Sequence, residues 1–232
     1  MITREHSHNG NKDIYNTSDN HNKDKSHAVN KNRIYVNEFP ERNVLPTRKA
    51  AKSSNHKIAI LSASITKPID MRNFNNNLLD NSHAIKRAFS GATASQLNIY
   101  VQATLKEDKP DTIIINAGTN NFTKKRHQSI EETVAEIMEI VNTCKRGGVK
   151  RVFVSSITCR PQFQSKIDAV NNLLEYNAGI YNYVFISNAS IREVHLRNDG
   201  VHLNNDGVHI LANNFISCLN RPSLSHFSSI WD

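Results

Sequence analysis

From residue 57 onward, short apolar segments alternate with longer segments that have a helical hydrophobic period. The expected strands are "KIAILS" (57–62), "AIKRAF" (84–89), "DTIIINAG" (111–118), "VKRVFVSSI" (149–157) and "YNYVFIS" (181–187). Parallel strands need a long crossover between them, which is usually a helix. The alternation therefore predicts a three-layer α/β/α domain with a flavodoxin-like, five-stranded parallel sheet.

The segments between these strands predict four helices. Residues 93–108 place Leu97, Tyr100, Val101 and Leu105 on one face, and residues 129–147 have the strongest apolar stripe. Ser129 and Glu132 have the spacing of a capping box at the start of this second helix. Further helical patterns run through 167–174 and from about 206 to 219.

The first part of the chain has a different composition. Residues 1–57 are rich in Asn, His, Lys, Asp and Ser and hold 11 of the 29 Lys and Arg but 6 of the 21 Asp and Glu, so they carry +5 of the net charge of +8. Such a segment buries too little apolar surface to offset the entropy of ordering. We therefore expect a disordered basic tail over 1–56 with solvated histidines (His6, His8, His21, His27 and His56), a folded domain over 57–220 and a loose extension over 221–232.

The remaining composition favours an intracellular protein, with the cytoplasm as the expected compartment. The three cysteines, Cys144, Cys159 and Cys218, are widely spaced and odd in number, which favours reduced thiols over a disulfide framework. The N-terminus has no signal-peptide pattern, and no apolar run approaches the ~20 residues of a membrane span. No Gly-x-Gly-x-x-Gly or P-loop motif is present, so no nucleotide cofactor is expected.

Polar residues follow each expected strand, at the edge where sites form in parallel sheets. Four blocks in this order, "AILSASITK", "FSGAT", "NAGTNN" and "NDGVHLNNDG", resemble the SGNH, or GDSL-type, hydrolase family over roughly residues 57–220. The resemblance implies a serine nucleophile at Ser64, a triad completed by Asp199 and His202, and an oxyanion hole built from Ser64, Gly91 and Asn120.

The chemistry of these residue types agrees with that implication. A serine hydroxyl needs a base to take its proton, and an imidazole, whose ordinary pKa is near 6.5, suits neutral pH. An aspartate can hold the imidazole tautomer and stabilise the imidazolium. The backbone N–H groups of Ser64 and Gly91 and the amide of Asn120 could receive the oxyanion. We therefore expect hydrolysis of an ester (an acetyl ester, a lipid ester or a thioester) through an acyl-serine, with no metal or organic cofactor.

The tetrapeptide Asp-Gly-Val-His occurs twice, at 199–202 and 206–209. The second copy has the pattern of a helix start, with Asn204 or Asn205 as the cap and a stripe formed by Val208, Leu211, Phe215 and Leu219. The first copy lies in the preceding loop, where Gly200 permits a turn. We therefore expect the first copy, and not the second, to act in catalysis. A metal site formed by His202, Asp206 and His209 is a weaker interpretation, because a helix cap explains the same spacing.

Two departures from the family pattern leave a second class of function open. Ser62 and Ala63 stand where the family usually has Gly and Asp, and Asn121 stands where many members have Asp. The alternative prediction is a weakened or inactive SGNH-like domain that acts as a binding module, for example for RNA through the basic tail or "TKKRH" (123–127). A solvated tail and a solvated loop are the simpler interpretations of both basic segments.

Overall fold

The computed structural model describes residues 55–123 and 126–222. The expected tail over 1–54, the basic pair 124–125 and the extension beyond 222 lie outside these residues. The expected boundary at 57 needs a correction by one residue. His56 is half-buried, its Nε2 lies 2.7 Å from the Thr112 hydroxyl, and burial lowers the pKa of its imidazole. His56 therefore belongs to the folded domain and is not a solvated tail histidine.

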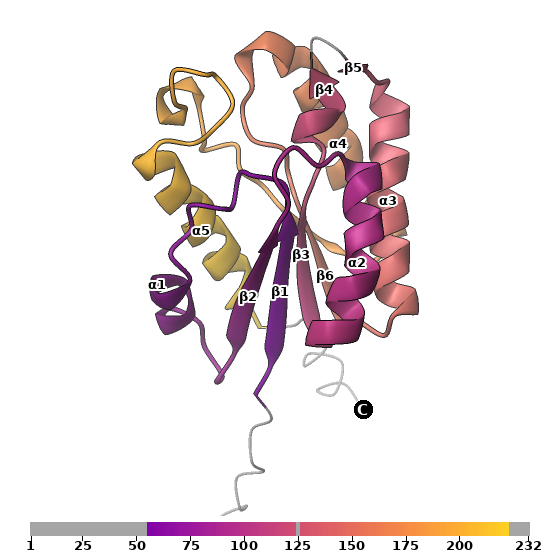
Figure 1. Cartoon of the computed structure of the whole chain (residues 1–232), viewed down its shortest axis with the longest axis vertical. Helices are drawn as coiled ribbons and strands as arrows, with labels where there is room; N and C mark the ends of the chain where they lie inside the picture. The colour runs from indigo at the N-terminus through magenta and orange to yellow at the C-terminus, as the bar shows by residue number, and fades with distance from the viewer. Residues whose placement is uncertain (1–54, 124–125, 223–232) are drawn as a thin grey trace, which may run out of the picture. The chain divides into compact units, whose positions relative to one another are not determined.

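A five-stranded, all-parallel sheet forms the centre of the domain (Figure 1), as predicted. Its strand order is β2-β1-β3-β6-β7, which is the flavodoxin-like order. The strands are β1 (Lys57–Ser62), β2 (His83–Ala88), β3 (Thr112–Asn116), β6 (Arg151–Ser155) and β7 (Val184–Ile186). The carboxyl ends of all five strands therefore lie along one edge of the sheet.

Helices cover both faces of the sheet (Figure 1). Side chains alternate along β1, so that Ala59 and Leu61 join the core on one face while Ile58 and Ile60 join the core on the other. The first face is covered by α2 (Ala94–Asp108), α3 (Ile130–Arg146) and α4 (Gln164–Ile180), and the second by α1 (Met71–Asn76) and α5 (Asn205–Leu219). The sequences of β1 and β3 are almost continuously apolar because both faces of these central strands are buried, whereas the edge strand β2 carries Lys86 and Arg87.

Most predicted elements are confirmed, and a few details differ from the prediction. Ser129 and Glu132 form the capping box at the start of α3, and a second capping box at Thr93 and Gln96 begins α2. Tyr100 does not join the buried stripe of α2: it is 40% exposed and stacks on Phe89 with ring centroids 3.9 Å apart. Short elements not predicted from the sequence are α1, the two-residue strands β4 (Phe122–Thr123) and β5 (Arg126–His127), and the 3-10 turns η1 (Thr119–Asn121), η2 (Pro161–Phe163) and η3 (Glu193–His195).

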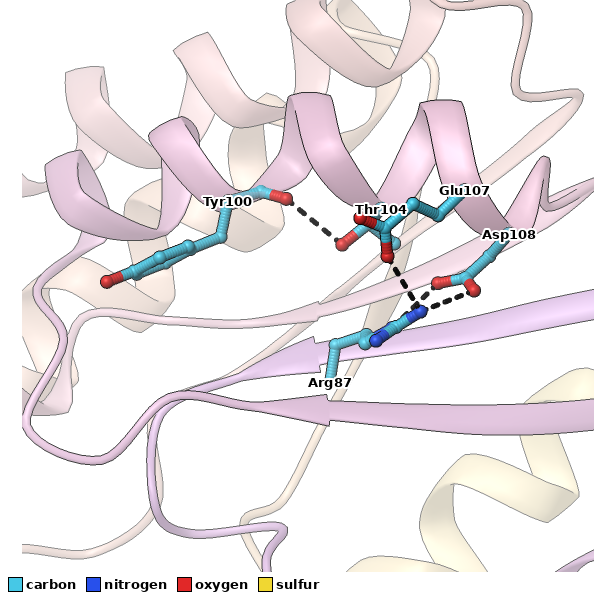
Figure 2. Close-up of polar contacts among 5 residues, drawn as sticks. All are labelled: Arg87, Tyr100, Thr104, Glu107 and Asp108. Atoms are coloured by element: carbon cyan, nitrogen blue, oxygen red, sulfur yellow. Dashed lines mark hydrogen bonds and ion pairs between the residues drawn. The ribbon is translucent and has the colours of Figure 1, made fainter.

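An ion-pair cluster joins the edge strand β2 to the last turn of α2 (Figure 2). Arg87 donates to both carboxylate oxygens of Asp108, from Nε at 2.8 Å and from Nη2 at 2.6 Å. Nη2 also lies 3.2 Å from a carboxylate oxygen of Glu107. The planar guanidinium matches the carboxylate in a two-point contact, which fixes the orientation of the helix against the strand.

Within the described residues, no helix combines the length and apolar character needed to cross a membrane.

Candidate active site

Ser64 lies in a tight turn directly after β1. The Lys67 N–H donates to the Ser64 carbonyl at 3.0 Å, which closes the turn, and Ser64 itself is half-buried. Its hydroxyl lies 3.1 Å from His202 Nε2, although the two residues are 138 positions apart in the chain. The fold therefore brings the predicted nucleophile and the predicted base into hydrogen-bonding distance.

The loop between η3 and α5 brings Asp199 back onto His202. Asp199 Oδ2 lies 2.8 Å from His202 Nδ1, while Oδ1 accepts the backbone N–H groups of Val201 at 2.9 Å and His202 at 2.8 Å. Gly200 has a φ of +67°, a left-handed conformation that permits this return. The hydrogen bonds from the backbone and then the ring of His202 lower the pKa of Asp199 to about 2, from an ordinary 3.8.

The ionised carboxylate fixes the state of the imidazole. A carboxylate can only accept hydrogen bonds, so His202 Nδ1 must carry the proton that faces Asp199. In the neutral ring, Nε2 is then unprotonated and accepts the hydrogen bond from the Ser64 hydroxyl. This is the tautomer that a general base next to a serine requires.

The second Asp-Gly-Val-His copy lies in α5, as predicted. Asn204 caps the helix by accepting the Gly207 N–H at 3.0 Å, and the predicted stripe is buried. His209 is exposed. Gly207 is needed because a Cβ at this position would lie 2.5 Å from the carbonyl oxygen of His195. The second copy therefore begins a helix.

Asn120 lies in η1, directly after β3 and Gly118. Its side-chain Nδ2 donates to the Ala92 carbonyl at 3.0 Å, and Ala92 directly follows Gly91 in the loop after β2. One hydrogen of the amide is used by this bond, and the second is available to another acceptor. The structure thus ties the loop that carries Asn120 to the loop that carries Gly91.

Asn121 occupies the position at which the family resemblance expects an aspartate. Its side chain is fully buried: Oδ1 accepts the Ala94 N–H at 3.0 Å, and Nδ2 donates to Gln128 Oε1 at 2.8 Å and Glu136 Oε2 at 2.7 Å. Glu136 Oε2 also accepts the Ser95 N–H at 3.2 Å. The first turn of α2 is therefore held by the amide oxygen of Asn121 together with a carboxylate supplied from α3. No sequence pattern links position 136 to position 121, so this partner was not predicted.

We expect an exchange of the amide and the carboxylate to show whether this pair replaces the missing aspartate. Asn121→Asp alone places two carboxylates in contact at a buried position, and we expect it to lower the free energy of unfolding by about 2–3 kcal/mol. Asn121→Asp combined with Glu136→Gln restores one carboxylate and one amide, and should return to within about 1 kcal/mol of the wild type. Urea unfolding measures both effects.

Glu139→Gln, on the exposed side of the same helix, is the matched control for this exchange, because the Glu139 carboxylate forms an ion pair with Arg146 at the surface and, among the described residues, makes no hydrogen bond with Asn121. A double variant no more stable than Asn121→Asp would show that Glu136 does not compensate for the missing aspartate.

Hydroxyl groups support the turn that carries Ser64, at the positions where the family resemblance expects Gly-Asp. The buried Ser62 hydroxyl donates to the Ala63 carbonyl at 2.9 Å and contacts the Thr66 hydroxyl. Ala63 is itself buried, at 2% exposure. The turn therefore has its own hydrogen bonds without an acidic side chain. The Ser-x-x-x-Thr spacing of residues 62 and 66 is the only sequence signal for this contact.

The arrangement of the five parallel strands and their flanking helices is the SGNH hydrolase fold. No protein-family model and no curated protein matches the sequence. Solved structures that share the fold include a GDSL-like lipase from Bacteroides thetaiotaomicron, with 20% identity and a TM-score of 0.60 over 70% of this chain and 87% of that chain.

Two further matches are acetyl esterases. One is an acetyl esterase mutant solved with an acetate ion, with 18% identity and a TM-score of 0.63 over 71% of this chain and 96% of that chain. The other is a catalytic mutant of an acetylxylan esterase from Geobacillus stearothermophilus, in which a histidine is replaced by alanine. It has 17% identity and a TM-score of 0.60 over 73% of this chain and 97% of that chain.

Proposed function

We propose that this protein is a serine esterase whose nucleophile is Ser64. The observation that carries the proposal is the continuous hydrogen-bonded series from the Ser64 hydroxyl through the imidazole of His202 to the carboxylate of Asp199, with distances of 3.1 Å and 2.8 Å. The three groups converge at the carboxyl edge of the sheet from the turn after β1 and the loop before α5. This edge is where sites form in folds of this type.

In the proposed reaction, His202 Nε2 takes the Ser64 proton as Oγ attacks the ester carbonyl carbon. Asp199 stabilises the resulting imidazolium, and the negative charge on the carbonyl oxygen is received by the Ser64 and Gly91 N–H groups and the Asn120 amide. The imidazolium then protonates the departing alcohol, which leaves an acyl-serine. A water molecule that gives its proton to His202 hydrolyses this ester and releases the acid.

The matched structures support an acetyl ester as the substrate. One of them holds an acetate ion, the product of acetyl ester hydrolysis, and others are of acetylxylan esterase. Two are described as catalytic mutants of that enzyme with an aspartate and a histidine replaced, and these two residues are three positions apart, as Asp199 and His202 are here. We therefore propose acetylated alcohols, with acetylated sugars the first to examine.

The proposal is tested by covalent labelling together with hydrolysis. The protein is treated with a fluorophosphonate, which reacts with activated serines, and the modified peptide is identified by mass spectrometry. We expect modification at Ser64, together with hydrolysis of p-nitrophenyl acetate and release of acetate from acetylated xylo-oligosaccharides. A protein that is not labelled at Ser64 and hydrolyses neither substrate above the background rate would contradict the proposal. Salt-dependent RNA binding by such a protein would support the alternative of a binding module.

The low pKa of Asp199 leads to a pH prediction. Because the folded-state pKa is about 2 and the ordinary value is 3.8, Asp199 stabilises the folded loop fully above about pH 4 and loses this effect as the pH falls through about 2. Asp199 then takes up no proton between about pH 4 and 7. As the pH is lowered from about 7 to 4, we expect log kcat/KM to fall with a slope of at most one per pH unit. A slope approaching two would show that the Asp199 carboxylate takes up a proton within this range.

A further inference from the structure

Arg160 lies between β6 and η2 and is buried, with 8% of its surface exposed. Its guanidinium Nη1 donates to the backbone carbonyl of Thr119, the residue before Asn120. The plane of the guanidinium is further held by the ring of Phe163, whose centroid lies 5.2 Å from Cζ. A side chain from the loop after one strand thus contacts the turn after the neighbouring strand.

Arg160 has no carboxylate partner in the part of the chain that the structure describes, because none lies within 4.0 Å of its nitrogens. Its Nε is buried and has no hydrogen-bond partner among the same residues. Burial of a guanidinium without a counter-charge costs free energy, and an apolar side chain of similar length would fill the same volume without this cost. Stability therefore does not account for a charge at this position.

The hydrogen bond from Arg160 to the Thr119 carbonyl indicates a role for the guanidinium in the candidate site. The Thr119 carbonyl and the Asn120 N–H belong to one peptide group, so a donor that holds this carbonyl also sets the orientation of the residue that carries the Asn120 amide. On the other side, among the residues that the structure describes, the Asn120 side chain is held by its bond to the Ala92 carbonyl. An uncompensated positive charge close to this peptide also favours the negative charge of an oxyanion, because electrostatic interactions are strong where water is excluded.

We infer that Arg160 is a positioning residue that holds the Asn120 side of the oxyanion hole and adds a positive charge behind it. This inference rests on the proposed esterase function. It assigns to the loop after β6 a part in the reaction, although Arg160 is not placed in contact with the substrate. The expected signature is a loss of kcat with little change in KM, because the interaction strengthens as charge develops on the carbonyl oxygen.

Arg160→Met and Arg160→Lys test the inference, with p-nitrophenyl acetate as substrate. Arg160→Met removes the donor and the charge, and we expect kcat to fall about 10- to 100-fold with KM within about threefold of the wild type. Arg160→Lys keeps the charge and a donor that can reach the carbonyl, and should recover kcat to within about fivefold of the wild type. Neither variant should unfold at a temperature clearly below that of the wild type.

Lys166→Met is the matched control, since Lys166 is a cation in the same region that lies 5.9 Å from the Phe122 ring centroid. Its kcat should equal that of the wild type. An Arg160→Met variant with wild-type kcat, or one that fails to fold, would overturn the inference, the second result because it assigns Arg160 to stability. If the wild type and Ser64→Ala hydrolyse the substrate at equal rates, the proposed function itself fails and the inference fails with it.

Discussion

Replacement of Ser64 by alanine is expected to lower kcat for p-nitrophenyl acetate by about 10⁴-fold or more, to the level that substrate binding and the oxyanion hole alone can support. The variant lacks the oxygen that lies 3.1 Å from His202 Nε2 and that we propose forms the acyl intermediate. The change removes one oxygen atom at a half-buried position, so thermal unfolding should stay within a few degrees of the wild type. Steady-state kinetics and differential scanning calorimetry measure the two effects.

Ser165→Ala provides the control for this substitution. Ser165 is exposed in the first turn of α4, and its removal should leave kcat unchanged. A Ser64→Ala variant with more than about a tenth of the wild-type kcat would assign the hydrolysis to another group, and the esterase proposal would then lose its nucleophile.

His202→Ala is the second substitution with a large expected effect, and the chain contains its own control. Without the imidazole, Ser64 has no base for its proton and the departing alcohol has no acid, so we expect kcat to fall by about 10⁴-fold or more. His209 occupies the same place in the second Asp-Gly-Val-His copy but lies exposed on α5. His209→Ala should retain the kcat and KM of the wild type.

The combination of Ser64→Ala with His202→Ala adds a second measurement. Groups that act as one unit lose little more when both are removed, so the double variant should be about as slow as either single variant. Multiplicative losses would mean that the two residues act independently, which the hydrogen bond between them does not predict. Equal losses in His202→Ala and His209→Ala would show that the first copy has no special role.

The fold was predictable because its signals are local. The strands β1 and β3 are buried on both faces and read as apolar runs, and the boundaries of α3 follow from a capping box and from glycines after its last turn. Helix α1 had no such signal, since it has six residues and buries only Phe74. The predicted strand 181–187 is longer than β7 because only Val184–Ile186 pairs with β6.

The candidate site was predictable to the extent that it follows from strand order. Ser64 and His202 are far apart in the chain, but both were expected at the carboxyl edge of the sheet, where the structure places them. Their catalytic roles stay predictions. The contacts of Glu136 and Arg160 had no signal, because each depends on how a neighbouring helix or loop packs and not on any spacing along the chain.

The repeated tetrapeptide Asp-Gly-Val-His shows that four residues do not by themselves determine the local structure. In the first copy the glycine is required because the backbone is left-handed there: Gly200 has a positive φ that other residues rarely adopt. In the second, the glycine is required for its small volume, as Gly207 leaves room for a passing carbonyl group. An engineer who exchanged the two glycines for alanines would meet torsional strain at one position and a steric clash at the other. The structural role of each Asp-Gly-Val-His copy is therefore set by its position relative to α5: the first copy lies in the loop before this helix, and the second lies in its first turns.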